Sequence, residues 1–346
     1  MTATTSTRTM DSLLTTTSDN LYKGQVIMDA FFESTAITKM LMQPNFKSKT
    51  KGGDRIRSAV RYGGNSTVKS QGEWEQYDTT PQDNLTTAFW DWKMVSGTAV
   101  MSTKEGFQNS GAAEIQDLWT DKIETTTMQF GEDINAQSMD LLNTAAATGN
   151  GGLNITSIPN LVSKDPTTGV VGAIDRASVS QWRNRTKQSS ATSHKQLVKE
   201  MWNIYHTASR GSGGSPDKIF CDQQTFELYV SGLDEKVRYQ STDKASAGFP
   251  AVGFAGATLF WDVDVPDPEN DLNGGADVSL AKGAMYMLNS KYFEFVVGEG
   301  FDFAPQGLEK GANQFVKIMP YLFMGELFST NLRKQAVFYN IARSLT

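Results

Sequence analysis

Residues that could support catalysis are few in this chain of 346 residues, and they are not grouped. The two histidines, His194 and His206, are twelve residues apart, which does not place both on one face of a helix. No Cys/His cluster accompanies them, so we expect no zinc site. The single cysteine, Cys221, stands in an apolar run, which favours a core thiol over a nucleophile.

Glycine-rich and nucleophile motifs are equally uninformative. No Gly-x-Ser-x-Gly elbow, Walker A loop or dinucleotide-binding Gly-x-Gly-x-x-Gly motif occurs. The glycines at 149, 151 and 152 follow a predicted helix and open no new one, which is typical of a linker. We therefore predict no catalytic residues, no cofactor and no metal.

The acidic run from Asp262 to Asp271 is the one segment that suggests a calcium loop. However, Pro266 occupies the third alternating position, and no bidentate glutamate closes the loop as an EF-hand requires. A solvated surface loop is the preferred interpretation, with an adventitious cation site as the alternative.

Three arginines, Arg55, Arg57 and Arg61, alternate with Ile56, Ser58 and Val60 in a pattern of period two. This pattern predicts a strand with the guanidinium groups on one face. They form either an ordinary solvated face or pairs with carboxylates on a neighbouring copy, because bidentate arginine–carboxylate contacts suit interfaces.

Acceptors and aromatic anchors for such an interface occur nearby. Glu73, Glu75 and Asp78 are plausible acceptors, and three tryptophans either pack locally or anchor a partner. We favour anchors, because the hairpin has no visible hydrophobic backing. The predicted intersubunit residues are Arg55, Arg57, Arg61, Glu73, Trp74, Glu75, Asp78, Trp90 and Trp92.

Residues 52–98 read as a long two-stranded hairpin with a glycine-rich, charged tip. The return strand carries Ala88, Trp90, Trp92 and Met94 on one face. A two-stranded hairpin of this length is only marginally stable in water by itself. We therefore expect it to pack on another copy of the protein.

A long helix follows, predicted from about Lys104 to Asn143. Ile115, Trp119 and Ile123 recur at the helical period with polar residues on the other side. About forty residues would make a rod of roughly 60 Å. The threonine run 125–127 and Gly131 are poor helix formers, which allows a bend there.

The remaining elements indicate an α/β region after a boundary at about 148–152. Before the hairpin we expect an N-terminal arm and one helix within 21–42. After the boundary, 153–171 read as irregular strand and turn. The predicted helices are 193–209, capped by Ser193, and 222–230, capped by Asp222. The predicted strands are 218–221, 258–265, 283–288, 293–297, 315–328 and 335–341.

Charge is distributed unevenly along the chain. Residues 1–69 hold 10 Lys/Arg and 5 Asp/Glu, a net charge of +5. The rest of the chain holds 22 Lys/Arg and 33 Asp/Glu, a net charge of −11, and the two parts sum to −6. A basic arm on an acidic body suggests contact with acidic surfaces or a partner subunit, and disfavours a general nucleic-acid binder. No apolar run is long enough to predict a membrane span.

The succession of these parts resembles the major capsid proteins of tailed bacteriophages, with the Hong Kong 97-type fold. The residues that carry the resemblance are Asp54-Arg-Ile-Arg57, Phe89-Trp-Asp-Trp-Lys93, the 104–143 helix, Gly172-Ala-Ile-Asp-Arg176 with Trp182-Arg183, Lys218-Ile-Phe-Cys-Asp222, Leu259-Phe-Trp-Asp-Val-Asp264, Met285-Tyr-Met-Leu-Asn-Ser290 and Thr330-Asn-Leu-Arg-Lys334. No segment is a sharp motif alone; the specificity lies in their order.

The resemblance implies a mixed α/β (α+β) subunit with an N-terminal arm (1–51), an extended loop (52–98), a peripheral domain with a spine helix (99–149), an axial domain (150–300) and a C-terminal return to the peripheral domain (301–346). It also implies hexamers and pentamers in an icosahedral shell around double-stranded DNA, assembled in the bacterial cytoplasm. Expected partners are further copies of the chain, a separate scaffolding protein, a portal and a decoration protein.

Two other functions remain open from the sequence. An encapsulin-type nanocompartment shell would keep the fold and enclose a cargo enzyme instead of DNA. A soluble α/β enzyme with an unrecognised site is the alternative from another class.

Overall fold

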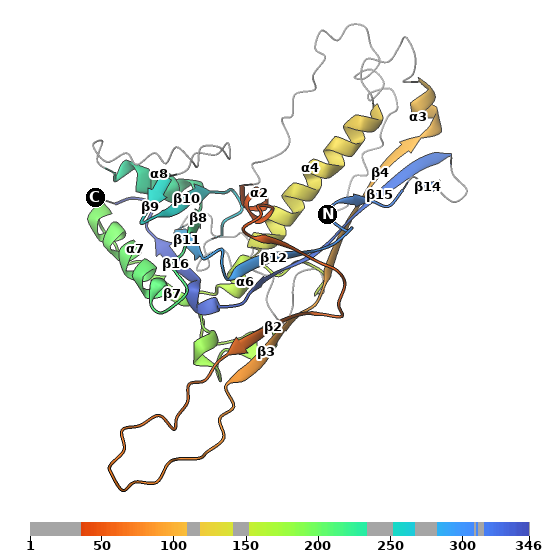
Figure 1. The fold of residues 1–346 in the computed structure, drawn as a ribbon. Helices are drawn as coiled ribbons and strands as arrows, with labels where there is room; N and C mark the ends of the chain where they lie inside the picture. The colour runs from red at the N-terminus through yellow and green to blue at the C-terminus, as the bar shows by residue number, and fades with distance from the viewer. Residues whose placement is uncertain are drawn as a thin grey trace. The chain divides into compact units, whose positions relative to one another are not determined.

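The computed structural model describes residues 36–108, 118–140, 152–233, 252–266, 282–307, 309–310 and 315–345. The chain divides into two compact units. Among the described residues, the smaller unit lies within Met94–Asp133 and Gly300–Met324, and the larger unit lies within Ser34–Lys93, Ile134–Glu299 and Gly325–Thr346. Helices and strands mix along the chain, which confirms the predicted α+β class (Figure 1).

A six-stranded mixed sheet organises the larger unit. Its order is β7-β16-β11-β8-β10-β9, with two parallel pairs, β7–β16 and β8–β10, and antiparallel pairing elsewhere. The strands are β7 (Arg185–Gln188), β8 (Lys218–Cys221), β9 (Val252–Phe254), β10 (Ala257–Trp261), β11 (Gly283–Leu288) and β16 (Ala336–Ile341). The last strand of the chain therefore joins the sheet of the region predicted to be axial, whereas we expected it to return to a peripheral domain.

Two helices pack on this sheet and supply its core. α7 (His194–Ser209) contacts β7 and β16, and α8 (Gln223–Ser231) contacts β10 and β11. Both helices confirm the sequence prediction. Asp222 caps α8 as predicted, since its side chain accepts from the backbone N–H of Thr225, whereas Ser193 precedes α7 without a side-chain cap bond.

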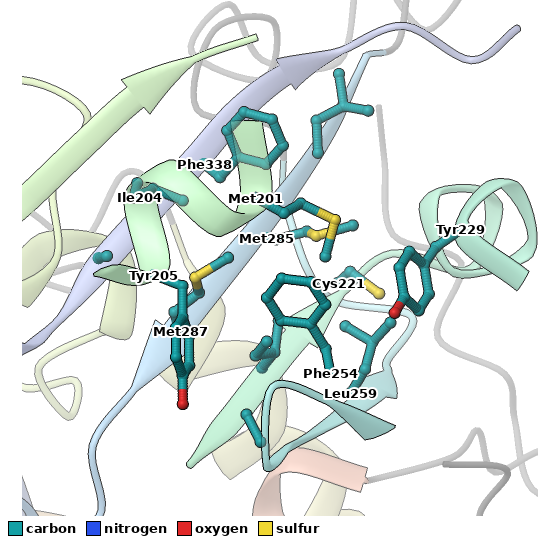
Figure 2. Packing of buried hydrophobic residues seen from close by; sticks show 14 of the residues in the cluster. Met201, Ile204, Tyr205, Cys221, Tyr229, Phe254, Leu259, Met285, Met287 and Phe338 are labelled. Atoms are coloured by element: carbon teal, nitrogen blue, oxygen red, sulfur yellow. The ribbon is translucent and has the colours of Figure 1, made fainter. Parts of the chain in front are cut away.

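The core between α7, α8 and the sheet is rich in aromatic and sulfur-containing side chains (Figure 2). β11 is buried along its whole length, which explains its continuous apolar run in the sequence. The labelled core residues are Met201, Ile204, Tyr205, Cys221, Tyr229, Phe254, Leu259, Met285, Met287 and Phe338.

A second sheet is built on the longest strand, β15 (Val316–Ser329). In the larger unit, β15 pairs antiparallel with β12 (Phe293–Gly298), which pairs in parallel with β1 (Lys47–Thr50). In the smaller unit, β15 pairs with β13 (Ala304–Pro305) and β14 (Glu309–Lys310), and β4 (Lys93–Ser102) is also its partner. The predicted strand at 315–328 is thus confirmed.

Within the described residues, the helix predicted from 104 to 143 corresponds to α3 (Thr103–Gln108) and α4 (Leu118–Met139). A capping box starts α3: the backbone N–H of Ser102 donates to Glu105, and the Ser102 hydroxyl accepts from the N–H of Lys104. Helix α4 ends at Met139, and Asp140 is not helical. Apolar periodicity identifies the packed face of a helix but does not fix its ends; residues 109–117 and 141–143 lie outside the described residues.

The threonine run does not interrupt α4, which is helical through Thr125–Thr127 and Gly131. Two of these hydroxyls are accommodated by back-bonding. Thr126 donates to the carbonyl oxygen of Lys122 at 2.7 Å, and Thr127 donates to that of Ile123 at 3.0 Å.

Short elements connect these parts. They are α2 (Ala36–Leu41), α6 (Ile158–Leu161), the β5–β6 pair (Val170–Val171 and Ile174–Asp175), and the 3₁₀ turns η2 (Ser180–Trp182) and η6 (Leu332–Lys334). Of the helix predicted within 21–42 only α2 falls in the described residues; residues 1–35 of the predicted N-terminal arm lie outside them.

Candidate functional site: the extended loop and its base

The base of the extended loop is a two-stranded antiparallel sheet of β2 (Ile56–Arg61) and β3 (Leu85–Trp90). Its register pairs Ile56 with Trp90 and Arg61 with Leu85. Apolar residues of both strands are buried on one side, as the alternation predicted. The hairpin itself is shorter than the predicted 52–98, because each paired strand has 6 residues.

The return strand does not continue past Trp90 as predicted. The strand is interrupted at Asp91 and Trp92. The next strand, β4, begins at Lys93 and joins the sheet of β15. The indole N–H of half-buried Trp92 donates to the carbonyl oxygen of Gly53 at 3.0 Å. The alternation of apolar and polar residues continues unchanged across residues 91 and 92, so the sequence did not predict this interruption of the strand.

Trp90 packs inside its own subunit, which argues against its predicted role as an anchor on a neighbour. It is 6% exposed, and its ring centroid lies 6.4 Å from Trp182 and 5.1 Å from Phe328. Gly172, with φ near 60°, approaches so closely that an added Cβ would lie 2.8 Å from the indole of Trp90. These contacts supply the hydrophobic backing that the hairpin sequence did not reveal.

The three arginines of the loop have different surroundings. Arg55 forms an ion pair with Asp91 of the same chain, with a 2.9 Å separation of Nε and Oδ1. Arg57 lies over the ring of Phe89, 5.7 Å from its centroid, and 3.9 Å from Asp54. Arg61 is exposed at the end of β2. Pairing with a neighbouring copy stays a prediction, and Arg61 is the arginine least engaged within the subunit.

Residues 62–84, the tip of the extended loop, contain no strand (Figure 1). Local polar contacts hold this segment. Lys69 pairs with Glu75 at 2.9 Å, and the N–H of Gly72 donates to the same carboxylate. Asp78 accepts from the hydroxyl and the N–H of Thr80. The bond from Lys69 lowers the pKa of Glu75, and the bond from Thr80 lowers that of Asp78. Two of the three predicted acceptors are therefore engaged inside the loop.

The tip also exposes large apolar side chains. Trp74 is 92% exposed, Tyr77 86% and Val68 80%. Glu73, the third predicted acceptor, is exposed beside them. A tryptophan in contact with water forgoes the burial that normally stabilises it, and the role of Trp74 as an anchor on a neighbour stays a prediction.

A buried acid at the base of the loop was not found from the sequence. Glu326 of β15 is 1% exposed, and its Oε1 accepts from the N–H groups of Thr156 and Leu327, each at 2.8 Å. Burial raises the pKa of Glu326 to about 7, although these hydrogen bonds and the charge of Lys93 act in the opposite direction. The sequence offered one signal for this buried acid, which is that Glu326 is the only charged residue in the apolar stretch 321–328.

Glu326 lines a cavity of about 280 Å³ at the base of the loop. The other lining residues are Arg55, Phe89, Trp90, Asp91, Lys93, Thr156, Asn160, Val170, Val171, Gly172 and Ala173. Lys93 donates from Nζ to the carbonyl oxygen of Gly152. The base of the loop thus contains a cavity with charged groups of both signs.

The start of the acidic run is buried, contrary to the predicted solvated loop. Asp262 accepts from the N–H of Ile37 at the start of α2 and from the side-chain amide of Asn135. The same amide group donates to Asp264 at 2.6 Å, and its oxygen, Asn135 Oδ1, accepts from the backbone N–H of Thr38. Burial raises the pKa of Asp262. These bonds join α2, α4 and the end of β10; residues 267–271 lie outside the described residues.

The described residues offer no support for a metal site, a membrane-spanning helix or a cysteine nucleophile. Within the described ranges no three His, Cys, Asp or Glu side chains gather as metal ligands, and no helix there is long and apolar enough to cross a membrane. His206 stacks on Trp202, with centroids 5.1 Å apart. Cys221 is buried, and desolvation raises the pKa of its thiol well above the usual value, which disfavours a nucleophile.

Comparison of the sequence with protein-family models and with curated proteins finds no match. Comparison of the structure with solved structures does. The chain of a cyanophage A-1(L) capsid asymmetric unit superposes with a TM-score of 0.65 at 12% identity, over 92% of this chain and 95% of that one. The capsid of a native GTA particle gives 0.55 at 13% identity, over 93% and 96%.

A third structure with the same fold is the holo-SrpI encapsulin complex from Synechococcus elongatus PCC 7942, with a TM-score of 0.51 at 9% identity over 94% of both chains. Identities this low show the fold alone. The chain therefore has the Hong Kong 97-type capsid fold along nearly its whole length, as the order of its parts suggested.

Proposed function

We propose that this chain is a major capsid protein that assembles into hexamers and pentamers of an icosahedral phage head. The observation that carries the proposal is the likeness, at more than nine-tenths coverage of both chains, to subunits of assembled phage and GTA capsids. The extended loop supports it independently, because its tip leaves Trp74 and Tyr77 in water and such side chains anchor protein interfaces.

On this proposal the parts have distinct roles. The loop at 52–98 would lie on a neighbouring subunit, and the sheet β7-β16-β11-β8-β10-β9 with α7 and α8 would form the axial domain. The smaller unit would be peripheral. The excess of acidic residues after residue 69 fits an inner wall that does not trap double-stranded DNA, since like charges repel. A separate scaffolding protein and a portal are the partners that such a shell needs.

Negative-stain microscopy of the purified full-length chain tests the assembly. Closed shells or rings of capsomers are expected, and a chain that stays monomeric or dimeric with and without a co-expressed scaffolding protein would contradict the proposal. Circular dichroism of the same sample shows whether such a result reflects misfolding.

An encapsulin-type shell is the second candidate, and the likeness to the SrpI complex favours it over an enzyme. The contents of particles from the native source separate the two shells. Double-stranded DNA together with portal and terminase genes near the gene supports a phage head. A folded cargo enzyme, such as a peroxidase or a ferritin-like protein, supports a nanocompartment.

A further inference from the structure

The cavity at the base of the extended loop contains an acid and a lysine that do not pair with each other. Its charged lining groups are Arg55, Asp91, Lys93 and Glu326. Arg55 and Asp91 already form an ion pair with each other. Lys93 instead holds the carbonyl oxygen of Gly152. Of the cations that line this cavity, only Lys93 is therefore without a carboxylate partner among the residues the structure describes.

Ionisation of Glu326 would change the balance between these contacts. A desolvated carboxylate attracts a nearby ammonium group more strongly than a neutral carbonyl does, because the local dielectric is lower than that of bulk water. A cavity of about 280 Å³ gives the flexible stem of Lys93 room to turn. No other acid competes for Lys93, since the remaining acid of the lining, Asp91, is paired with Arg55.

We propose that Glu326 and Lys93 form a proton-controlled latch at the base of the extended loop. When Glu326 is neutral, Lys93 ties β4 to the carbonyl group of Gly152. When Glu326 releases its proton to solvent, Lys93 leaves that carbonyl group and pairs with the carboxylate. No covalent bond changes in either direction.

The latch acts on two segments that meet at the loop base. Lys93 is the first residue of β4 and directly follows the break at Asp91 and Trp92. Gly152 begins the described segment that leads to Thr156, whose N–H binds Glu326. Because the pKa of Glu326 is raised to about 7, the change from the tied to the untied state falls near neutral pH. This inference concerns the single subunit and does not depend on shell assembly.

The test combines carboxyl-carbon NMR of glutamate-labelled full-length chain with hydrogen–deuterium exchange. The Glu326 signal, assigned by its loss in Glu326→Gln, should titrate near neutral pH. After correction for intrinsic rates, residues 90–94 and 152–156 should exchange at least about threefold faster at about pD 8 than at about pD 6 in the wild type. Glu326→Gln should show the slow rate at both values, and Lys93→Met the fast rate at both. Glu294→Gln, a half-buried acid on β12, should behave as the wild type.

Three results would overturn the latch. The first is titration of Glu326 below about pH 5, which is the range of an ordinary glutamate. The second is a pH response of both segments that persists in Glu326→Gln, and the third is one that persists in Lys93→Met. If Glu326→Gln fails to fold, the wild-type titration and Lys93→Met still decide the question.

Discussion

The tip of the extended loop and the core of the six-stranded sheet treat similar side chains in opposite ways. The sheet core buries Phe338, Tyr229 and Phe254 between strands and helices (Figure 2), whereas the loop tip leaves Trp74 and Tyr77 in water. Carboxyl groups show the same contrast. Glu75 and Asp78 of the loop have lowered pKa values because they accept hydrogen bonds at the surface, and buried Glu326 has a raised pKa because it is desolvated.

The contrast indicates where each region obtains its free energy. The sheet core is complete within one subunit, so substitutions there should change the stability of the free chain. Among the described residues the loop tip makes local polar contacts alone, so substitutions there should leave the stability of the free chain unchanged and act on assembly. A variant that breaks this division would show that the loop packs within its own subunit.

The largest stability effect is expected from Phe338→Ala. Phe338 is fully buried in the sheet core, and removing such a ring costs roughly 3–5 kcal/mol of unfolding free energy. Tyr77→Ala, which truncates an aromatic side chain of the loop tip, should stay within about 0.5 kcal/mol of the wild type. Denaturant unfolding of the unassembled chain measures both, and similar losses for the two variants would erase the contrast.

Glu326→Gln should stabilise the chain at alkaline pH. The folded state raises the pKa from 4.5 to about 7, so it holds the proton more tightly than the unfolded chain does. Glu326 therefore lowers stability progressively as pH rises through this interval, and its full penalty, about 3 kcal/mol, is present above it.

Unfolding free energies of wild type and variant at several pH values check this expectation. The two chains should differ most at about pH 8 and converge toward about pH 4. Glu73→Gln, in the exposed loop, is the matched control and should parallel the wild type throughout. A constant difference between Glu326→Gln and the wild type would mean that the acid is not titrating in this range.

A smaller loss is expected from Lys334→Met. Lys334 is buried, and its ammonium group donates to the carbonyl oxygens of Ser209, Arg210, Gly211 and Gly214 at 3.0–3.3 Å. The variant keeps the length of the stem but leaves these oxygens without their donor, at a cost of roughly 1–3 kcal/mol. Lys199→Met, on the exposed side of α7, is the control, and equal stability of the two variants would contradict this role.

Periodicity predicted the elements well wherever one face is buried inside the subunit. α7, α8, β8 and β11 were found from apolar spacing and cap residues, because local pattern and tertiary burial agree there. The order of the parts then predicted the fold itself.

Features that depend on residues far apart in the chain could not be predicted. The backing of Trp90 comes from Trp182, Gly172 and Phe328. The buried state of Asp262 depends on Ile37 and Asn135, which are 225 and 127 residues away. Alternation shows that a face is apolar but not what covers it, so three tryptophans of one hairpin looked alike in the sequence and have different surroundings in the structure.

The sharpest form of the comparison is between two tryptophans of this loop. Trp74→Ala should change the unfolding free energy of the free chain by less than about 0.5 kcal/mol, because the side chain touches little within the subunit. If Trp74 fills a pocket on a neighbour, its loss should weaken that contact by 2 kcal/mol or more, about thirtyfold, at every equivalent site of a shell.

Trp90→Phe should do the reverse. It should lower the stability of the free chain by roughly 1–3 kcal/mol through the cavity it leaves beside Trp182 and Phe328, and the folded fraction should still assemble. Light scattering and electron microscopy of both variants, beside their unfolding curves, separate the two effects. Normal shells from Trp74→Ala would show that the exposed tip is not an anchor, and contact between subunits would then have to rest on the arginine face of β2.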